Sequence, residues 1–308
     1  MRKSTRGDDG RHPLASSSSR SRWLANLRLR IVTAAVLIPV VIALAWLGGW
    51  VTVAGVLIVL LLAARELHRM LARKGWQPLT VASIALSVDF LLAARLPEAR
   101  MLLLALGISA TVVGASGWLL VSRPAAEQTL VAWALTLAIP FYLGWPLAFL
   151  VALRGDGIGP SAPGFWWLMA LLLGVWANDS GALLCGHYFG RGGRHLLAPR
   201  LSPKKTWEGV AGGVACAIIA VFVVAGVGGH VPAHPLAALA WYHCLALGVL
   251  LATAATLGDL SKSLFKRVTG VKDSGTLLPG HGGMLDRVDS TLFAVYIVFF
   301  YALGLGAL

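Results

Sequence analysis

Acidic residues at helical spacing lie close to the C-terminal end of this apolar chain. Asp286 and Asp289 are three residues apart, so on a helix their carboxylates point to the same side. They follow a glycine-rich turn in which Gly282 and Gly283 come directly after His281. Such turns let backbone N–H groups bind an anion, and Mg²⁺ is held by one or two carboxylates together with substrate phosphates. The pattern predicts a magnesium and phosphate site; acids that only favour a helix N-terminus would explain one aspartate but not the turn.

A second polar group lies upstream in the sequence "GDLSKSLFKR". Asp259, Ser263 and Lys266 are spaced i, i+4 and i+7, which places them on one face if a helix continues through this segment. A carboxylate, a hydroxyl and an ammonium along one stripe can hold a metal ion and the phosphate that it bridges. A salt bridge between Asp259 and a nearby lysine explains the same residues equally well.

Asn178 and Asp179 interrupt a long apolar segment in the sequence "GVWANDSGALLCG". A carboxylate within an apolar run of membrane length is costly to bury, so it is a functional candidate by default. The alternative is an acid that pairs with a basic residue of a neighbouring helix and only holds the helices together. Three adjacent polar residues, Asn178, Asp179 and Ser180, are more than one such ion pair needs. This favours a substrate-binding role for Asn178 and Asp179.

Lys204 and Lys205 precede another apolar segment in the sequence "LSPKKTWEG". Thr206 can cap the helix that follows, with Glu208 in its first turn. Cationic side chains beside the free N–H groups of a helix N-terminus suit a phosphate. An ordinary basic loop with a helix cap is the alternative.

The composition excludes a soluble globular protein. The 308 residues have a mean hydropathy of +0.77, and only 13% of them are charged, against about 25% in ordinary soluble domains. Nine apolar runs are candidate membrane spans, namely 31–48, 50–64, 79–94, 101–122, 129–152, 164–186, 209–229, 236–257 and 289–307. We expect an all-α, polytopic membrane protein; because the second and third runs are short, eight spans are the alternative.

The net charge of +13 does not require a nucleic-acid partner. With the N-terminus on the cytoplasmic side, 23 of the 26 Lys and Arg residues fall in inner segments and three in outer loops, which is the bias that orients membrane proteins. We expect residues 1–30 to form a disordered basic arm that lies against anionic lipid headgroups. A transmembrane domain over 31–308 would follow it. The two longest polar loops, 187–208 and 258–288, then face the cytoplasm, where nucleotides are found.

Together, these groups predict a group-transfer reaction at a membrane surface. Carboxylates for a divalent cation, basic side chains for phosphate oxygens and glycine turns would all lie on the cytoplasmic face of a helix bundle. Phosphoryl and nucleotidyl transfer depend mostly on positioning and charge neutralisation, which these side chains supply. One substrate should be a water-soluble polyphosphate and the other a lipid.

The segment from Ser263 to Asp289 carries a family resemblance. Its sequence, "SLFKRVTGVKDSGTLLPGHGGMLDRVD", resembles the signature of the phosphatidate cytidylyltransferases, also called CDP-diacylglycerol synthases. "NDSGA" at 178–182 and "SPKKTWEG" at 202–209 extend the resemblance. Residues 165–308 are covered by it, and we therefore expect them to hold the catalytic part.

The resemblance implies a reaction in which the phosphate of phosphatidic acid attacks the α-phosphorus of CTP, giving CDP-diacylglycerol and pyrophosphate. It implies an enzyme of the inner cell membrane whose active site faces the cytoplasm and which uses Mg²⁺, with K⁺ as a candidate second cation. By matching motif, Asp259, Asp286 and Asp289 would bind metal, with Ser263 and Lys266 near the transferred phosphate. The residues expected to bind substrates are Asn178, Asp179, Lys204, Lys205, Arg267, Lys272, Asp273, His281, Gly282, Gly283 and Arg287.

Other functions stay open at this point. A related membrane enzyme that uses CTP, such as a polyprenol kinase or a synthase for another lipid backbone, would differ in its product. A transporter would fit nine spans and Asp179, but it predicts charged residues spread through the bundle, whereas here they concentrate in two inner loops and the adjoining helix ends. A catalytically idle scaffold conflicts with the presence of every acid and base of the signature. Assembly as a homodimer is also left open.

Overall fold

The computed structural model describes residues 32–33, 35–190, 195–227, 234–271, 274–275 and 282–307, and these are almost entirely helical. After a first helix, Ala35–Leu47, come α2 (Gly49–Arg73), α3 (Thr80–Arg95), α4 (Arg100–Ser122), α5 (Glu127–Ile139), η1 (Pro140–Gly144), α6 (Trp145–Arg154), η2 (Gly159–Ser161), α7 (Pro163–Tyr188), β1 (Leu196–Ala198), β2 (Ser202–Thr206), α8 (Trp207–Val227), α9 (Trp241–Val268) and α10 (Leu285–Gly304). The basic arm over 1–30 lies outside the described residues.

Seven helices in the described part are long and apolar enough to cross a membrane. One of them runs unbroken from Glu127 to Arg154 through the wider π-helical turn η1, which begins at Pro140, a residue without an N–H group. The expected all-α, membrane-spanning architecture is therefore confirmed. The helices Ala35–Leu47 and α3 are shorter, at about 20 and 24 Å, against a hydrocarbon core of about 30 Å. A total of nine spans stays a prediction.

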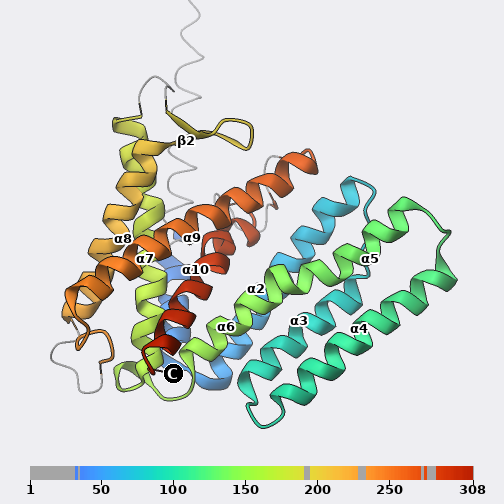
Figure 1. Cartoon of the computed structure of the whole chain (residues 1–308), viewed down its shortest axis with the longest axis horizontal. Helices are drawn as coiled ribbons and strands as arrows, with labels where there is room; N and C mark the ends of the chain where they lie inside the picture. The colour runs from blue at the N-terminus through green and yellow to red at the C-terminus, as the bar shows by residue number, and fades with distance from the viewer. Residues whose placement is uncertain are drawn as a thin grey trace, which may run out of the picture.

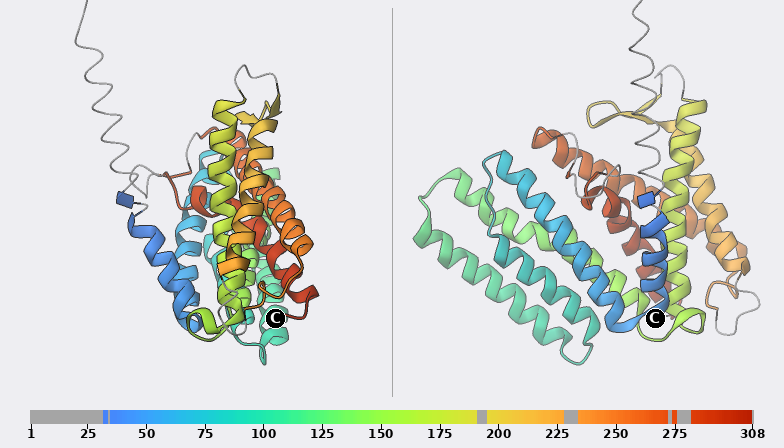
Figure 2. Two further views of the ribbon diagram at one scale, coloured as in Figure 1. Left: turned by 90° about the vertical axis from the view of Figure 1, so that its left-hand side faces the viewer. Right: turned by 180° about the vertical axis from the view of Figure 1, so that it is seen from behind.

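The helices pack around two hydrophobic cores that α10 shares. Trp167, Leu251 and Val295 belong to the core of α7, α8, α9 and α10, whereas Leu67 and Leu292 belong to the core that includes α2, α3 and α6. In Figure 1 the helices α7 and α8 lie on one side of α10 and α2 to α6 on the other, while α9 runs diagonally past α10. Ala45 of the first helix belongs to the former core, and the Trp46 ring contacts that of Phe165 in α7. The view from behind in Figure 2 shows this helix beside α7. The start of α10 thus lies where both halves of the bundle meet.

Small residues allow α7 and α8 to approach closely. A Cβ atom added at Gly181 of α7 would lie 2.6 Å from the Cys216 sulfur, and one at Gly213 of α8 would lie 2.6 Å from the Asn178 side chain. In membranes, where apolar contact with lipid is as favourable as contact with another helix, such small-residue contacts drive helix association. They fix the C-terminal half of α7, where Asn178 and Asp179 lie.

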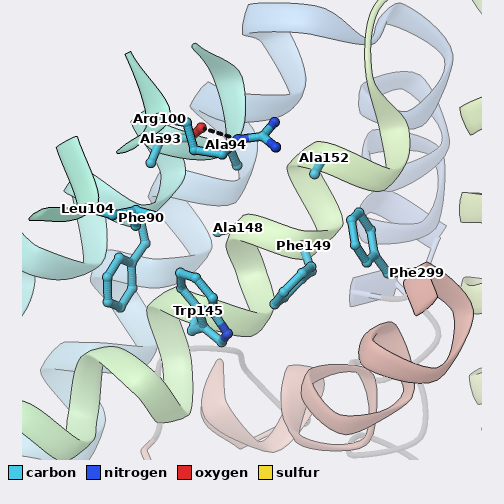
Figure 3. A pocket seen from close by; sticks show the side chains of 10 residues that line it. All are labelled: Phe90, Ala93, Ala94, Arg100, Leu104, Trp145, Ala148, Phe149, Ala152 and Phe299. Carbon is cyan, nitrogen blue, oxygen red and sulfur yellow. Dashed lines mark hydrogen bonds between the residues drawn. The ribbon is translucent and has the colours of Figure 1, made fainter. Parts of the chain in front are cut away.

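An apolar pocket lies between α3, α4, α6 and α10 (Figure 3). Phe90, Trp145, Phe149 and Phe299 supply aromatic rings to its wall. Arg100 lies at its edge, with its Nε donating to the Ala93 carbonyl at 3.3 Å. None of the candidate site residues lines this pocket.

Arg154 joins the first helix to the end of α6. Its buried guanidinium donates to the carbonyl of Ala45 and, at 2.9 Å each, to the carbonyls of Trp46 and Gly157. Nearby, Arg95 pairs with Asp156 at 2.8 Å. These contacts gather two of the three arginines assigned to the outer loops at one end of the bundle.

Arg154→Met keeps most of the side-chain volume but leaves these carbonyls without their donor. Hydrogen bonds to a charged group contribute about 1.5–3 kcal/mol. We therefore expect the free energy of unfolding, measured by thermal unfolding in detergent, to fall by roughly 3 kcal/mol. Arg100→Met, at the same end but exposed, is the matched control and should change stability little. Equal Tm values for the two variants would contradict this role of Arg154.

Candidate active site

The candidate site forms where the C-terminal part of α9 meets the first turn of α10. Because α9 continues to Val268, Asp259 and Lys266 share one helix, as their spacing predicts. A Cβ atom at Gly258 would overlap the Asp289 carbonyl, so a glycine at this position lets the two backbones touch. The two helices therefore bring their acidic residues together at one point.

Lys262 lies at the centre of these acids. Its Nζ is 2.9 Å from Asp259 Oδ1 and 3.1 Å from Asp286 Oδ1, and it also pairs with Asp289 Oδ2. The Lys262 side chain is 8% exposed and that of Asp289 5%. We call Asp259, Asp286 and Asp289 the aspartate cluster. One ammonium group thus contacts three carboxylates from two helices.

Two further lysines reach the aspartate cluster from its edge. Lys205 of β2 pairs with Asp259 Oδ2 at 2.7 Å, and Lys266 pairs with Asp286 Oδ1 at 3.2 Å. The salt bridge considered as an alternative for Asp259 is therefore present, and it belongs to a larger network. Lys204, which is exposed on β2, has no ion pair in the described part of the chain.

The C-terminal half of α7 adds a fourth aspartate beside the cluster. Asp179 Oδ1 accepts a hydrogen bond from the Ser290 hydroxyl at 3.5 Å and one from Asn178 Nδ2 at 3.3 Å. Asn178 Oδ1 is buried and has no hydrogen-bond partner in the described part of the chain. The structure thus brings Asp179 to α10, and none of the ion pairs between described residues joins it to a basic residue of a neighbouring helix.

The turn before α10 is organised around Asp286. Gly282 has a φ of 78°, a conformation that favours glycine. The N–H groups of Gly283 and Ser274 donate to Asp286 Oδ2 at 3.4 and 3.2 Å, and the Ser274 hydroxyl donates to the same oxygen at 2.8 Å. The donors expected to bind a substrate anion are directed here at a carboxylate of the protein. A role of Gly282 and Gly283 in binding substrate stays a prediction.

Several predicted site residues lie away from the cluster or beyond the described residues. The Ser263 hydroxyl donates to the backbone carbonyl of Asp259 at 2.8 Å. Arg267 Nε donates to the Leu201 carbonyl at 3.1 Å, so its side chain is directed to the loop between β1 and β2. Arg287 is exposed in the first turn of α10. Lys272, Asp273 and His281 lie outside the described residues.

The cap predicted for the helix after the two lysines is confirmed. The Thr206 hydroxyl oxygen accepts a hydrogen bond from the Gly209 N–H at 3.2 Å, and α8 begins at Trp207. Glu208, in the first turn, pairs with His195 at 2.6 Å. This cap fixes the end of β2, from which Lys205 reaches Asp259.

Lys262 and Glu66 are the two charged residues that the sequence analysis missed. Lys262 is three residues after Asp259, and this spacing alone allows an ion pair on one helix face. Glu66, a buried residue of α2, accepts hydrogen bonds from the Met284 and Leu285 N–H groups at 2.9 Å each. Glu66 follows the apolar run 50–64 and has Arg65, His68 and Arg69 as neighbours, so its sequence context does not distinguish it from the residues of a charged loop.

The chemistry of the cluster suits a hard divalent cation. No group of three or more His, Cys, Asp or Glu side chains in the described part of the chain stands ready to enclose a metal ion, because Lys262 lies between the aspartates. Mg²⁺, however, needs only one or two carboxylates when substrate phosphates complete its shell. The aspartate cluster pairs with three lysines, Lys205, Lys262 and Lys266, and Asp179 beside it has no ion pair among the described residues, so a cation would offset remaining negative charge.

Lys262→Met should destabilise the protein because three carboxylates then face one another without the central ammonium. Removing one partner of a buried ion pair costs about 3–5 kcal/mol. We expect the free energy of unfolding, measured by thermal unfolding without added divalent ion, to fall by this amount. Adding Asp289→Asn to Lys262→Met should recover part of it, since one of the repelling charges is removed. Lys204→Met is the matched control and should leave the Tm unchanged. If Lys262→Met had the same Tm as Lys204→Met, Lys262 would not hold the aspartate cluster together.

Comparison with known proteins identifies the family of this chain. The model of the cytidylyltransferase family matches residues 28–304, so the match includes the N-terminal half that the motifs did not reach. A phosphatidate cytidylyltransferase of Brucella suis is 34% identical over 286 residues, covering 90% of this chain and 94% of that protein. One of Synechocystis sp. is 33% identical over 299 residues, covering 88% and 95%. This chain belongs to the cytidylyltransferase family.

Proposed function

We propose that this protein transfers the cytidylyl group of CTP to phosphatidic acid, giving CDP-diacylglycerol and pyrophosphate. The observation that carries the proposal is the convergence of Asp259, Asp286 and Asp289 on one point, with Lys205 and Lys266 at its edge, in a membrane protein of this family. The relatives that cover the chain are named phosphatidate cytidylyltransferases. Lipid and nucleotide chemistry both fit a charged site at the end of an apolar bundle.

The reaction joins two anions, so charge neutralisation is its main requirement. An oxygen of the lipid phosphate attacks the α-phosphorus of CTP, the new P–O bond forms, and the bond to the β-phosphate oxygen breaks to release pyrophosphate. The attacking phosphate is already ionised at neutral pH, so no strong general base is needed. Lys205 and Lys266 are placed to offset the charge of the phosphates and to orient them.

Mg²⁺ is proposed as the cation of this reaction, held by members of the aspartate cluster together with substrate phosphates. When bound, it would polarise a phosphoryl oxygen and stabilise charge on the pyrophosphate that leaves. For the aspartates to reach the ion, Lys262 would give up part of its contacts with them. A second, monovalent cation such as K⁺ and assembly as a homodimer stay predictions.

We also propose that the aspartate cluster faces the cytoplasm and that the N-terminus lies on the same side of the inner membrane. The end of the bundle that holds Arg95 and Arg154 carries few basic residues, whereas Arg73, Lys74 and the lysines of the site lie toward the other end. This asymmetry supports a cytoplasmic site by the positive-inside rule. CTP would reach the site from that side and the lipid from the inner leaflet.

Purified protein incubated with labelled CTP, phosphatidic acid and Mg²⁺ should form CDP-diacylglycerol and pyrophosphate in equal amounts. Asp286→Asn and Asp289→Asn should each lower the rate by about 100-fold or more, because each removes a negative charge that positions the cation. Asp156→Asn is the control, since this exposed aspartate pairs with Arg95 at the far end of the bundle. A phosphorylated lipid without cytidine would favour a lipid kinase, and near-wild-type rates in both cluster variants would refute the metal assignment.

The proposed orientation predicts which positions a membrane-impermeant maleimide can reach. In spheroplasts, whose inner membrane is intact, Asp156→Cys should be labelled and Lys204→Cys should not. Both should be labelled after the membrane is permeabilised. The three native cysteines lie on apolar helices, and the unmodified protein measures their background. The reverse labelling pattern would place the aspartate cluster outside.

A further inference from the structure

We infer that Glu66 is a positioning residue for the aspartate cluster, acting on the first turn of α10 and on Asp286 through Ser274. The inference rests on the proposed function only in naming the reaction that the cluster serves. Glu66 comes from α2, far from the signature segment in sequence, and lies beside the turn that precedes α10. Glu66 therefore lies outside every motif that the sequence analysis identified, although it contacts residues of the signature segment.

The contacts of Glu66 fix both oxygens of its carboxylate. Oε1 accepts from the Met284 N–H at 2.9 Å, and Oε2 accepts from the Leu285 N–H at 2.9 Å. These N–H groups belong to the start of α10, where a helix has no partners of its own for its first donors. Glu66 is 5% exposed, so water does not compete for these bonds. The carboxylate thus caps α10 from a different helix and holds the position of its first turn.

Ser274 connects Glu66 to the aspartate cluster. Its hydroxyl lies 3.2 Å from Glu66 Oε2 and 2.8 Å from Asp286 Oδ2, and its N–H donates to the same Asp286 oxygen. Asp286 is also one residue beyond Leu285, whose N–H Glu66 holds. Two routes, one through the backbone and one through the serine, therefore set the orientation of the Asp286 carboxylate.

Glycines on both sides of the carboxylate show that the chain leaves room for it. A Cβ atom at Gly275 would lie 2.5 Å from Glu66 Oε1, and one at Gly283 would overlap Glu66 Oε2 and the Ser274 hydroxyl. Gly283 belongs to the glycine-rich turn that the sequence assigned to anion binding. In the described part of the chain, this turn instead makes space for two carboxylates of the protein, Glu66 and Asp286.

A buried carboxylate could instead serve only to hold α2 in the bundle, and His68 shows what such a residue looks like. His68 is buried two residues further along α2, and its ring nitrogens lie 2.7 Å from the Ala64 carbonyl and 2.9 Å from the Ser83 hydroxyl of α3. These contacts do not reach α10. His68→Ala therefore tests the loss of a buried polar contact of α2 without changing the first turn of α10.

The test compares Glu66→Gln with His68→Ala in the full-length protein. The glutamine keeps the shape but turns an NH₂ group toward one of the two N–H donors, so one hydrogen bond is lost. We expect hydrogen exchange of the peptide 283–290 to quicken about tenfold or more in Glu66→Gln and to stay unchanged in His68→Ala. We expect the Mg²⁺ concentration for half-maximal transfer to rise about tenfold in Glu66→Gln, with at most a twofold change in His68→Ala.

Ser274→Ala provides a second variant should Glu66→Gln not fold. Removing the hydroxyl cuts only the serine route, so the Mg²⁺ midpoint should rise by about threefold. Combined with Glu66→Gln, its effect should be smaller than the product of the two single effects, because both act on Asp286. A double variant equal to that product would contradict the coupling through Ser274.

The outcomes separate this inference from the proposed function. If the wild-type protein makes no CDP-lipid, the proposed function falls, while the exchange comparison still decides whether Glu66 holds the start of α10. Unchanged exchange and an unchanged Mg²⁺ midpoint in Glu66→Gln would overturn the inference. Equal changes in Glu66→Gln and His68→Ala would reduce Glu66 to a structural residue of α2.

Discussion

Opposite charges that are buried together at one end of an apolar bundle determine how the rest of this structure is arranged. Asp286 and Asp289 have side chains only 10% and 5% exposed, and Lys262, which joins them, is 8% exposed. An isolated ion in such surroundings loses several kcal/mol of hydration. The helices that carry these groups must therefore pack closely enough for the buried charges to form ion pairs.

The structure meets this requirement with small residues and with helix ends. Gly258 lets α9 and α10 touch beside the acids, and Gly181 and Gly213 bring α7 against α8. Asp286 lies in the first turn of α10, where N–H groups without helical partners and the helix dipole favour negative charge. The cap at Thr206 directs Lys205 toward the same place. Backbone geometry and electrostatics thus agree on one location for the site.

The sequence predicted the helical, membrane-spanning architecture and much of this site, because apolar runs and residue spacing along one helix are local signals. Asp259 and Lys266 on one face of α9, and the cap at Thr206, are examples. Contacts between distant segments carry no such signal. That Glu66 would meet Leu285, and that Lys262 would lie among aspartates of two helices, depends on how α2, α9 and α10 pack. The three aspartates that the sequence grouped together do converge, whereas the lysine between them was missed. Their role as metal ligands stays a prediction.

The sharing of α10 between the two hydrophobic cores also affects how this protein is made. A ribosome releases α2 and α9 before α10, so during synthesis Glu66 and Lys262 are inserted while their partners on α10 are still absent. For that interval each is a polar group without its final contacts in or beside lipid, and the two halves of the bundle lack the helix that joins them. Completion of the aspartate cluster is thus tied to the last inserted helix of the described chain. In a chain interrupted before α10, Glu66 would lack the two N–H donors of α10 and Lys262 would keep only its partner on α9, Asp259, and both would be presented to the quality-control machinery of the membrane.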